Sequence, residues 1–489
     1  MSDTTTDLWR MSAIELAEAI RSRQTSSQEV IEAHLRRMEE VNPSVNAVTV
    51  VLGERAIEAA KVADREVVGG ADLAPFHGVP FTIKANIDLA GTPTTHGLKA
   101  LAGAYPDRDA PHVERVRAAG AIPIGRTNLP DFAIGWHTDS EMWGATVNPW
   151  DRSRTPGASS GGEAAALATG MTPLGLGNDT GGSVRWPAQC CGISALKPTL
   201  GRIPHATTIE PVDLPISNQL MGVEGPLARR VADLRAAFEV MAGPTWRDPW
   251  TVPAPLRGPE PVKPVRVALV LDPASQGTAG QVQDGVRKAA RALEDAGYAI
   301  EEVEPPSIDV AARMWLDILI PPVRAGWEIW LPLVRPYTRQ FVSALFEVAG
   351  DLDPGTHMQS FVTRHSLLRA WGEFQETHPL ILAPISTDMP FEVGKDRTTP
   401  EVAAIVRGMR MALAINVLGL PAVALPVGIG HGLPQSVQVI GPRFREDLCL
   451  DAAAALEDRL GIITPIEPSA PSRPEAQVQA TALASVSVP

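Results

Sequence analysis

Two segments of the chain combine small residues with serine in patterns that could support nucleophilic chemistry. Residues 157–161 read Gly-Ala-Ser-Ser-Gly, and residues 177–183 read Gly-Asn-Asp-Thr-Gly-Gly-Ser. Glycine is common where a backbone approaches another group closely or adopts an unusual conformation. Two such segments in one short stretch indicate a built site. They raise the questions of which serine reacts and which group activates it.

The first segment matches G-x-S-x-G, the pattern that places the nucleophilic serine of α/β-hydrolases on a sharp turn after a strand. Here that serine would be Ser159. The preceding residues, 148–156, contain two prolines and alternating charge, which a central strand does not accommodate. An esterase of the α/β-hydrolase type that uses Ser159 is therefore kept only as an alternative.

Two further patterns could supply a nucleophile. Residues 194–197 match S-x-x-K, but Pro198 disfavours the helical turn that would bring the serine and the lysine together. Cys190 and Cys191 have no activating base near them in the sequence, and cysteines are often simply buried. A structural role is the simpler interpretation of both patterns.

Histidine and cysteine do not predict a metal site, because neither shows the spacing of metal ligands. His137, next to Trp136, is the one histidine in a motif-like loop. Both are named as possible pocket residues, although a surface or packing role is the simpler interpretation of the histidine.

The second segment follows a run of residues that predicts a short strand, and it ends at Ser183. Backbone N–H groups that converge beside a serine hydroxyl can stabilise a developing oxyanion. A helix cap at Ser183 is the alternative, and the segment alone does not decide between the two.

Long, ordered parts of the chain resemble the amidase signature family of serine hydrolases, and the resemblance extends from about residue 10 to about residue 462. Its motifs are much longer and more specific than the short patterns above. They comprise residues 77–84, 125–132, 148–151 and 156–204.

The resemblance implies a Ser–Ser–Lys triad. Ser183 would be the nucleophile, Ser159 would relay its proton, and Lys84 would be the base. Ser183 follows Ser159 by 24 residues, which is the usual separation in the family. The resemblance also implies a cis peptide bond between Ala158 and Ser159.

This chemistry is coherent in physical terms. A serine hydroxyl needs a base to become a good nucleophile, and lysine can act as a base only when it is neutral. Burial can lower the pKa of a lysine by up to ~3–5 units. An acyl-enzyme would then form on Ser183 and be hydrolysed by water.

The resemblance assigns supporting roles to the residues around the nucleophile. Asp179 and Arg185 would brace the turn without a direct chemical role. The backbone N–H groups expected to hold the oxyanion are those of Thr180, Gly181, Gly182 and Ser183.

The chain departs from the family pattern without losing a triad residue. Ala85 replaces the aspartate that usually follows the lysine, and Ala158 replaces a glycine. Asn178 stands where threonine or serine is common, and Ala195 where glycine is common.

Composition favours a globular enzyme over a nucleic-acid-binding or membrane protein. The 489 residues are 44% hydrophobic and carry a net charge of −13, which argues against a basic binding surface. The three cysteines form no disulfide pattern, and no signal peptide or membrane span is evident. We expect a cytoplasmic monomer or homodimer that acts on a small molecule and needs no cofactor.

Apolar periodicity predicts alternating strands and helices, which favours a mixed or mostly parallel sheet with helices on both faces. The resemblance implies a single large α/β domain. Its central twisted mixed β-sheet would be covered by α-helices on both faces. This domain would span residues 7–465, with a helical N-terminal part over about 7–66 and a catalytic core over about 67–465. Residues 466–489, rich in proline, serine and alanine, are expected to form a flexible tail. Proline-rich residues 253–264 could be a surface loop or a hinge.

Members of the family cleave amides, esters and carbamates, and some belong to tRNA-dependent amidotransferases that need partner chains. The acidic charge weighs against the latter, which remains an alternative. Residues 313–346 are apolar and aromatic and could line an entrance for aryl substrates, although ordinary helix packing is slightly favoured. Their aromatic residues include Trp315, Trp327, Trp330, Tyr337 and Phe341.

Overall fold

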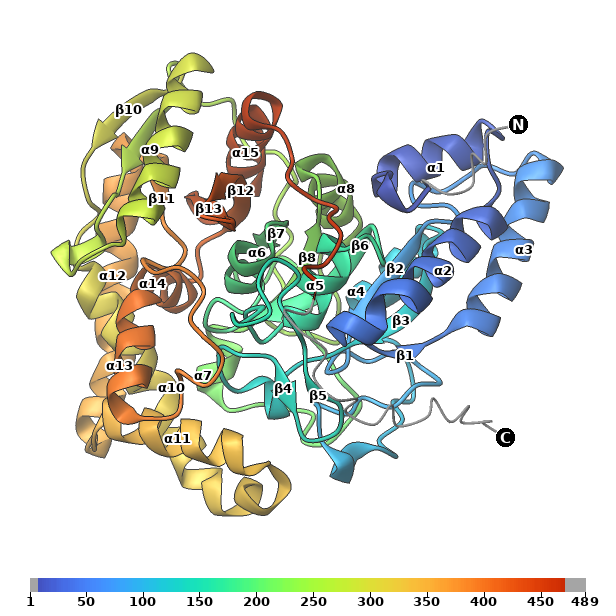
Figure 1. Cartoon of the computed structure of the whole chain (residues 1–489). Coiled ribbons are helices and arrows are strands. Elements are labelled where there is room, and N and C mark those ends of the chain that lie inside the picture. The colour runs from blue at the N-terminus through green and yellow to red at the C-terminus, as the bar shows by residue number, and fades with distance from the viewer. Residues whose placement is uncertain (1–7, 471–489) are drawn as a thin grey trace.

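The computed structural model describes residues 8–470 of the chain. Its centre is a mixed sheet of 11 strands (Figure 1). The strand order is β1-β3-β2-β6-β8-β7-β12-β13-β11-β9-β10. Pairs β2/β3, β2/β6, β9/β10 and β9/β11 are parallel, whereas the other pairs are antiparallel. The predicted mixed sheet is therefore confirmed.

The strands of this sheet are short, and a separate two-stranded ribbon joins β4 to β5. The strands are β1 (Val48–Val51), β2 (Pro80–Lys84), β3 (Ile122–Thr127), β4 (Asp139–Ser140), β5 (Gly144–Ala145), β6 (Leu174–Asp179), β7 (Ser194–Lys197), β8 (Val223–Ala228), β9 (Arg266–Leu269), β10 (Ala299–Glu302), β11 (Leu380–Ala383), β12 (Ala422–Gly430) and β13 (Leu433–Ile440).

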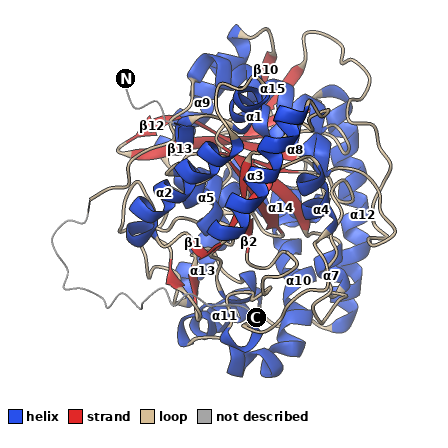
Figure 2. Ribbon diagram, turned by 90° about the vertical axis from the view of Figure 1, so that its right-hand side faces the viewer, coloured by secondary structure: helices blue, strands red, loops and turns tan. Residues whose placement is uncertain are grey.

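Helices connect most of these strands and surround the sheet (Figure 2). They are α1 (Ala13–Arg21), α2 (Ser27–Val45), α3 (Gly53–Gly69), α4 (Pro111–Ala118), α5 (Gly161–Ala168), α6 (Arg185–Cys191), α7 (Ile216–Gln219), α8 (Val231–Met241), α9 (Gly280–Asp295), α10 (Ile308–Trp330), α11 (Pro336–Ala349), α12 (Pro354–Thr377), α13 (Thr399–Gly408), α14 (Arg410–Leu418) and α15 (Glu446–Leu460).

The sheet separates two hydrophobic cores, as expected for a sheet with helices on both faces. Successive side chains of a strand point to opposite faces. In β12, Ala422 and Ala424 join one core, and Val423 and Leu425 join the other. The first core includes residues of α3, α5, α6, α10 and α14, and the second includes residues of α1, α4, α8, α9 and α15.

Local capping sets where the first two long helices, α1 and α2, begin. Ser12 and Ser26 each cap a helix by accepting a hydrogen bond from the backbone N–H three residues later. Glu15 and Glu29 complete the two capping boxes by accepting from the cap residues. The chain between α1 and α2 is thereby held outside helical geometry.

Three parallel strands bring the chemical residues to one edge of the sheet. The carboxyl ends of β2, β3 and β6 carry Lys84, Thr127 and Asp179, and parallel strands expose their carboxyl ends together. After β6 the chain turns through Ser183 into α6. After β5 an irregular segment reaches Ser159 just before α5.

Two sequence alternatives do not fit this architecture. No strand lies between β5 and α5, so Ser159 does not follow a strand as the α/β-hydrolase elbow requires. Residues 194–197 form β7, in which positions three apart face opposite sides of the sheet. The serine and lysine of the S-x-x-K pattern are therefore not neighbours on a helical turn.

The loop and tail regions can be compared with their expectations only in part. Residues 253–264 lie in the segment that joins β8 to β9, two strands of the same sheet. In the expected tail, Ile466 donates its N–H to Ala168 O at 2.8 Å, and Ser469 donates its N–H to Pro149 O at 2.8 Å. The remainder of that expected tail, residues 471–489, lies outside the described residues.

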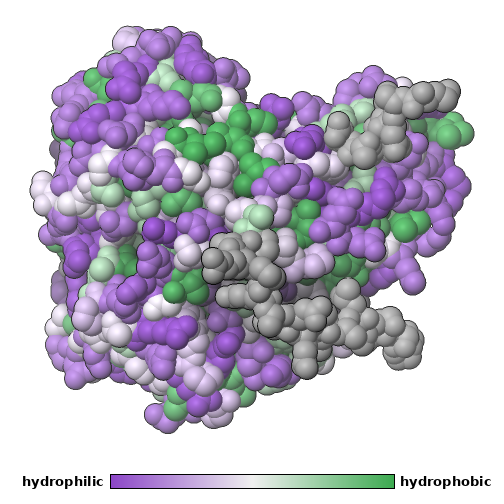
Figure 3. Space-filling model, viewed as in Figure 1, coloured by the Kyte–Doolittle hydropathy of each residue, from purple (hydrophilic) through white to green (hydrophobic). Residues whose placement is uncertain are grey.

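The surface is largely hydrophilic on the face shown in Figure 3, where hydrophobic residues form only small patches. Within residues 8–470, no helix is both long enough and apolar enough to cross a membrane.

The N-terminal segment packs on the end of α5 through Trp9, and this contact is testable. A Cβ atom at Gly170 would lie 2.2 Å from the Trp9 ring, and Gly170 has a φ of +78°. The variant Gly170→Ala should therefore lower the free energy of unfolding by about 2 kcal/mol, because it combines overpacking with left-handed backbone strain. Urea unfolding followed by circular dichroism measures the change.

A matched control is Gly69→Ala at the end of α3, where an added Cβ would meet nothing within 4 Å. Its urea midpoint should stay at or above that of the wild type. Equal midpoints for Gly170→Ala and the wild type would contradict the proposed packing constraint.

Candidate active site

Lys84 and Ser159 form the centre of the site. Lys84 Nζ lies 2.7 Å from Ser159 Oγ, and their side chains are 0% and 1% exposed. The peptide bond between Ala158 and Ser159 is cis, as the resemblance implies. A proton can therefore pass between the serine hydroxyl and the amine without crossing water.

Asn178 gives the Lys84 amine a second, neutral hydrogen-bond partner. Lys84 Nζ is 2.6 Å from Asn178 Oδ1, and Asn178 Nδ2 donates to Asn86 Oδ1 at 3.2 Å. An amide oxygen can only accept hydrogen bonds. A neutral Lys84 that donates to Asn178 keeps its lone pair for the hydroxyl hydrogen of Ser159.

The surroundings of Lys84 favour its neutral form. Burial lowers the pKa of Lys84 to about 7, and this effect outweighs the attraction of Glu224, Asp179 and Glu163, which raises it. The amine therefore loses its proton near neutral pH, where it can act as a base.

Glu163, on α5, is an acid buried in the same region. It accepts hydrogen bonds from Thr82 Oγ1 on β2 at 2.6 Å and from Thr127 Oγ1 on β3 at 2.9 Å. Burial raises the pKa of Glu163 to about 8, which favours the protonated carboxyl near neutral pH. Glu163 therefore ties α5 to two strands while adding little negative charge beside Lys84.

The two serine segments are joined by their backbones. Ser160 donates its N–H to Ser183 O at 3.1 Å. Ser183 is 9% exposed, which makes it the most accessible of the three predicted triad residues. The structure therefore brings Lys84, Ser159 and the Ser183 turn into one region.

Asp179 and Arg185, expected to brace the nucleophile turn, form a fully buried ion pair. Arg185 Nε lies 3.1 Å from Asp179 Oδ2, and Arg185 Nη2 lies 3.1 Å from Oδ1. Burial would raise the pKa of Asp179, but the charge and hydrogen bonds of Arg185 outweigh it and hold that pKa below its usual range. Asn416 adds a third contact, because its Nδ2 donates to Asp179 Oδ1 at 2.9 Å.

One of the expected oxyanion donors has a different partner in the structure. The Gly182 N–H donates to Asp179 Oδ1 at 2.8 Å and to Asn416 Oδ1 at 3.1 Å. This N–H is therefore already paired with buried acceptors inside the protein. The donors that remain from the expected set are the N–H groups of Thr180, Gly181 and Ser183.

Trp136 and His137 differ in their relation to the site. Trp136 Nε1 donates to Gly181 O at 3.0 Å, so its indole touches the nucleophile turn directly. His137 is 2% exposed, lies 3.1 Å from Thr155 Oγ1 and packs edge-on against Tyr337. Burial lowers the pKa of His137 to about 4, so the ring is neutral and packed inside the protein.

The aromatic residues of 313–346 serve different purposes. Trp315 Nε1 donates to Thr180 O at 2.8 Å, whereas Trp327 is buried edge-on against Phe346. Phe341 is buried against Trp136. Packing therefore accounts for most of this region.

Trp330 belongs to a half-buried aromatic row with His96 and Phe132. The ring centroids of Phe132 and Trp330 lie 5.5 Å apart, and those of His96 and Phe132 lie 6.3 Å apart. His96 donates its N–H to the carbonyl of Ala85, the residue after Lys84, at 3.2 Å. The row therefore begins beside the end of the sheet that carries Lys84.

Cysteine chemistry is disfavoured by burial. Cys190 and Cys191 are both 0% exposed, and burial raises the pKa of each thiol. A thiolate nucleophile at either position would be both inaccessible and unstable.

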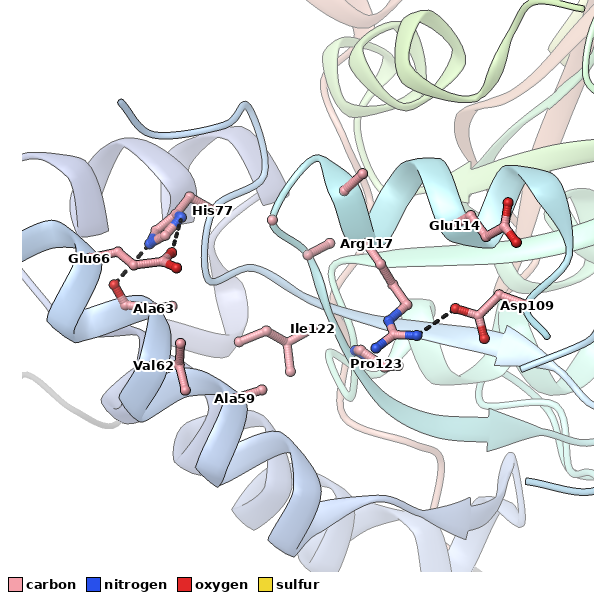
Figure 4. Close-up of a pocket in the computed structure, with 13 residues that line it drawn as sticks. Ala59, Val62, Ala63, Glu66, His77, Asp109, Glu114, Arg117, Ile122 and Pro123 are labelled. Carbon is pink, nitrogen blue, oxygen red and sulfur yellow. Dashed lines mark hydrogen bonds and ion pairs between the residues drawn. The ribbon is translucent and has the colours of Figure 1, made fainter. Parts of the chain in front are cut away.

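An open hollow of about 580 Å³ lies elsewhere on the molecule, between α3 and α4 (Figure 4). It borders the amino ends of β2 and β3, whereas Lys84 lies at the carboxyl end of β2. Arg117 pairs with Asp109 in this hollow, and His77 Nε2 contacts Ala63 O at 3.0 Å. It is therefore separate from the chemical site.

The family model "Amidase" matches residues 29–326 and 340–450, and the chain belongs to this family. The protein is a hydrolase of the amidase signature type that acts on carbon–nitrogen bonds.

Two relatives and one solved structure illustrate the breadth of the similarity. An indoleacetamide hydrolase of Bradyrhizobium diazoefficiens is 42% identical over 93% of this chain and 88% of its own length. A glutamyl-tRNA(Gln) amidotransferase subunit of Symbiobacterium thermophilum is 32% identical over 91% of this chain and 96% of its own. The crystal structure of a bacterial aryl acylamidase superposes with a TM-score of 0.78, at 26% identity over 92% of this chain and 96% of that one.

Sequence reasoning missed several residues that hold the site together. Asn178 stood out only as a departure from the family pattern, and Asn86 carried no signal. Asn416, on α14, lies 237 residues from Asp179, and no local motif marks it. Trp315 was visible as one of several aromatic residues, but its contact with Thr180 depends on the tertiary fold.

The contact between Asn178 and Lys84 predicts a change in pH dependence. The catalytic efficiency kcat/KM should rise through about pH 7 as Lys84 loses its proton. In Asn178→Asp, a carboxylate close to the amine raises the pKa of Lys84, so the rising limb should move upward by about 1–3 pH units. Activity at pH 7 should fall and recover at higher pH, as pH profiles of kcat/KM would measure.

Asn178→Ser is the matched control, because a hydroxyl provides an acceptor without a charge. Its limb should stay within about half a pH unit of the wild type, a much smaller shift than a nearby charge causes. An unchanged or lowered limb in Asn178→Asp would exclude the proposed contact.

Proposed function

We propose that the protein hydrolyses primary amides of arylacetic acids, of which indole-3-acetamide is the model substrate, through an acyl-enzyme on Ser183. Ser159 passes the proton of Ser183 to Lys84 and returns it to the departing ammonia. Water then releases the carboxylic acid. The observation that carries the proposal is the buried 2.7 Å contact between Lys84 Nζ and Ser159 Oγ, in a site where the pKa of Lys84 is about 7.

The position of Ser183 supports its role as the nucleophile. Ser183 lies at the end of the turn that follows strand β6, and its carbonyl accepts a hydrogen bond from the N–H of Ser160, the residue after Ser159. Ser183 is also more exposed than Ser159. The buried ion pair of Asp179 with Arg185 keeps this turn in place. Thr180, Gly181 and Ser183 offer the N–H groups that can hold the oxyanion of the tetrahedral intermediate.

The substrate class is supported by the relative named an indoleacetamide hydrolase and by the aromatic row. His96 and Phe132 are half-buried near the Lys84 end of β2, and Trp330 packs behind Phe132. Burial lowers the pKa of His96 to about 4, so its neutral ring can border an apolar group. These rings form a wall against which an aryl group can stack.

A component of a tRNA-dependent amidotransferase remains the second candidate, because a relative named as an amidotransferase subunit aligns with 91% of the chain. The higher identity to an indoleacetamide hydrolase, 42% against 32%, favours the stand-alone hydrolase. Hydrolysis of an arylacetamide by the purified chain alone would separate the two candidates.

A substrate panel tests the proposed function directly. The purified protein should release ammonia from indole-3-acetamide and phenylacetamide faster than from acetamide, and it should hydrolyse both faster than acetanilide, an aryl ester or an aryl carbamate. Ser183→Ala should lower kcat by at least about 10⁴-fold, the scale seen when a catalytic triad loses a member.

A fluorophosphonate probe provides an independent readout in the same experiment. It should label the wild type and fail to label Ser183→Ala. Labelling that persists in Ser183→Ala would assign the nucleophile to another residue. Equal rates on all amides would retain the nucleophile and reject the aryl preference.

The aromatic row predicts a selective loss of aryl recognition. Phe132→Leu should raise KM for indole-3-acetamide by about three- to tenfold, the value of an aromatic stacking contact, and leave KM for acetamide unchanged. Phe374→Leu is the control, because Phe374 stacks on His378 at the end of α12. Steady-state kinetics on both amides would show the difference, and a parallel rise for acetamide would point to general damage instead.

A further inference from the structure

Every carbonyl group of the nucleophile turn, residues 180–183, accepts a hydrogen bond from a group outside the turn. Two of the donors are indole N–H groups, and two are backbone N–H groups. The pairs are Thr180 O with Trp315 Nε1 at 2.8 Å, Gly181 O with Trp136 Nε1 at 3.0 Å, Gly182 O with Trp186 N at 2.7 Å, and Ser183 O with Ser160 N at 3.1 Å.

These contacts also set the directions of the N–H groups, because the C=O and N–H of a trans peptide point in opposite directions. The N–H groups of Gly182 and Val184 both donate to Asp179, at 2.8 and 3.2 Å. No acceptor among residues 8–470 takes the N–H of Gly181 or of Ser183. The turn thus alternates between N–H groups held by Asp179 and N–H groups left for a ligand.

Trp315 controls the first of these open N–H groups. Its indole holds the carbonyl of the peptide unit that contains the Gly181 N–H. Its ring covers one side of that peptide, since a Cβ atom built on Gly181 would lie 2.9 Å from Trp315 Cζ2. The side chain is 6% exposed and packs with Trp136 at 5.8 Å between ring centroids. The Gly181 N–H must therefore face away from the indole.

We propose that Trp315 is a positioning residue of the oxyanion site, which acts by aiming the Gly181 N–H at the oxygen of the tetrahedral intermediate. This inference rests on the proposed role of Ser183 as the nucleophile. Tryptophan suits the role because its indole nitrogen is a donor only, so the peptide cannot reverse and keep the contact. Donation to the carbonyl also polarises the peptide and strengthens its N–H as a donor.

The central experiment compares Trp315→Phe with Trp327→Phe. Both positions are buried on α10, but Trp327 packs on Phe346. Trp315→Phe should lower kcat on indole-3-acetamide by about tenfold, less than the loss of an oxyanion donor itself, because the donor remains but is no longer held. In Trp315→Phe, KM should change by less than about threefold. Trp327→Phe should keep kcat within about twofold of the wild type, because Trp327 makes no contact that aims the Gly181 or Ser183 N–H at the oxyanion.

The inhibition constant of a boronic-acid analogue of the substrate is a second measurement, and a simple loss of packing would not change it. The tetrahedral adduct of this analogue places an oxygen at the oxyanion position, so its inhibition constant should rise about tenfold in Trp315→Phe. Inhibition by the product acid should change little. An unchanged boronate affinity, or equal losses in the two tryptophan variants, would overturn the proposal.

Gly181→Ala keeps the test valid if Trp315→Phe does not fold, because the added Cβ displaces the indole while the tryptophan remains. Its kcat and boronate affinity should fall as in Trp315→Phe, and the double variant should lose little more. Wild-type kcat in Gly181→Ala would contradict the proposal. Absence of amide hydrolysis or fluorophosphonate labelling in the wild type would instead reject the proposed function.

Discussion

The buried carboxylate of Asp179 is the contact on which the rest of the site depends. It accepts hydrogen bonds from the N–H groups of Gly182 and Val184, from Arg185 and from Asn416. An isolated charge in this position would be very costly, but each of its oxygens has several donors. The N–H groups of Gly182 and Val184 help to offset the cost of burying this carboxylate. The carboxylate in turn holds these two N–H groups in place and so fixes the shape of the turn that carries Ser183.

Lys84, the proposed base, presents the opposite electrostatic problem, since it must be buried without staying charged. Burial lowers its pKa, and the surrounding acids limit the decrease to about 7. Glu163 would favour the charged amine if it were fully ionised, but burial raises its own pKa to about 8. Two threonine hydroxyls satisfy its oxygens instead. The carboxyl group of Glu163 can therefore lie near Lys84 without holding Lys84 in its protonated form.

Sequence predicted the elements that carry the candidate site residues far better than it predicted the connections between them. The long motifs that resemble the amidase signature family pointed to Lys84, Ser159 and Ser183, since these motifs are local. The hydrogen bonds from Asn416 and Trp315 join α14 and α10 to the turn after β6. Such contacts arise from tertiary packing, and no spacing along the chain encodes them. The orientation of the Gly182 N–H was missed for the same reason, because it depends on which acceptor lies nearest in space.

In the proposed mechanism, Asn178 explains how a site with a buried lysine can transfer a proton in both directions. Its amide oxygen accepts from Lys84 in either protonation state, but it carries no charge. A carboxylate in its place would hold the proton on Lys84 and slow its return to the leaving group. A purely apolar side chain would leave the charged amine poorly solvated and would discourage the first transfer. A neutral acceptor lies between these limits, and it suits a base whose pKa must remain near the pH at which the enzyme works.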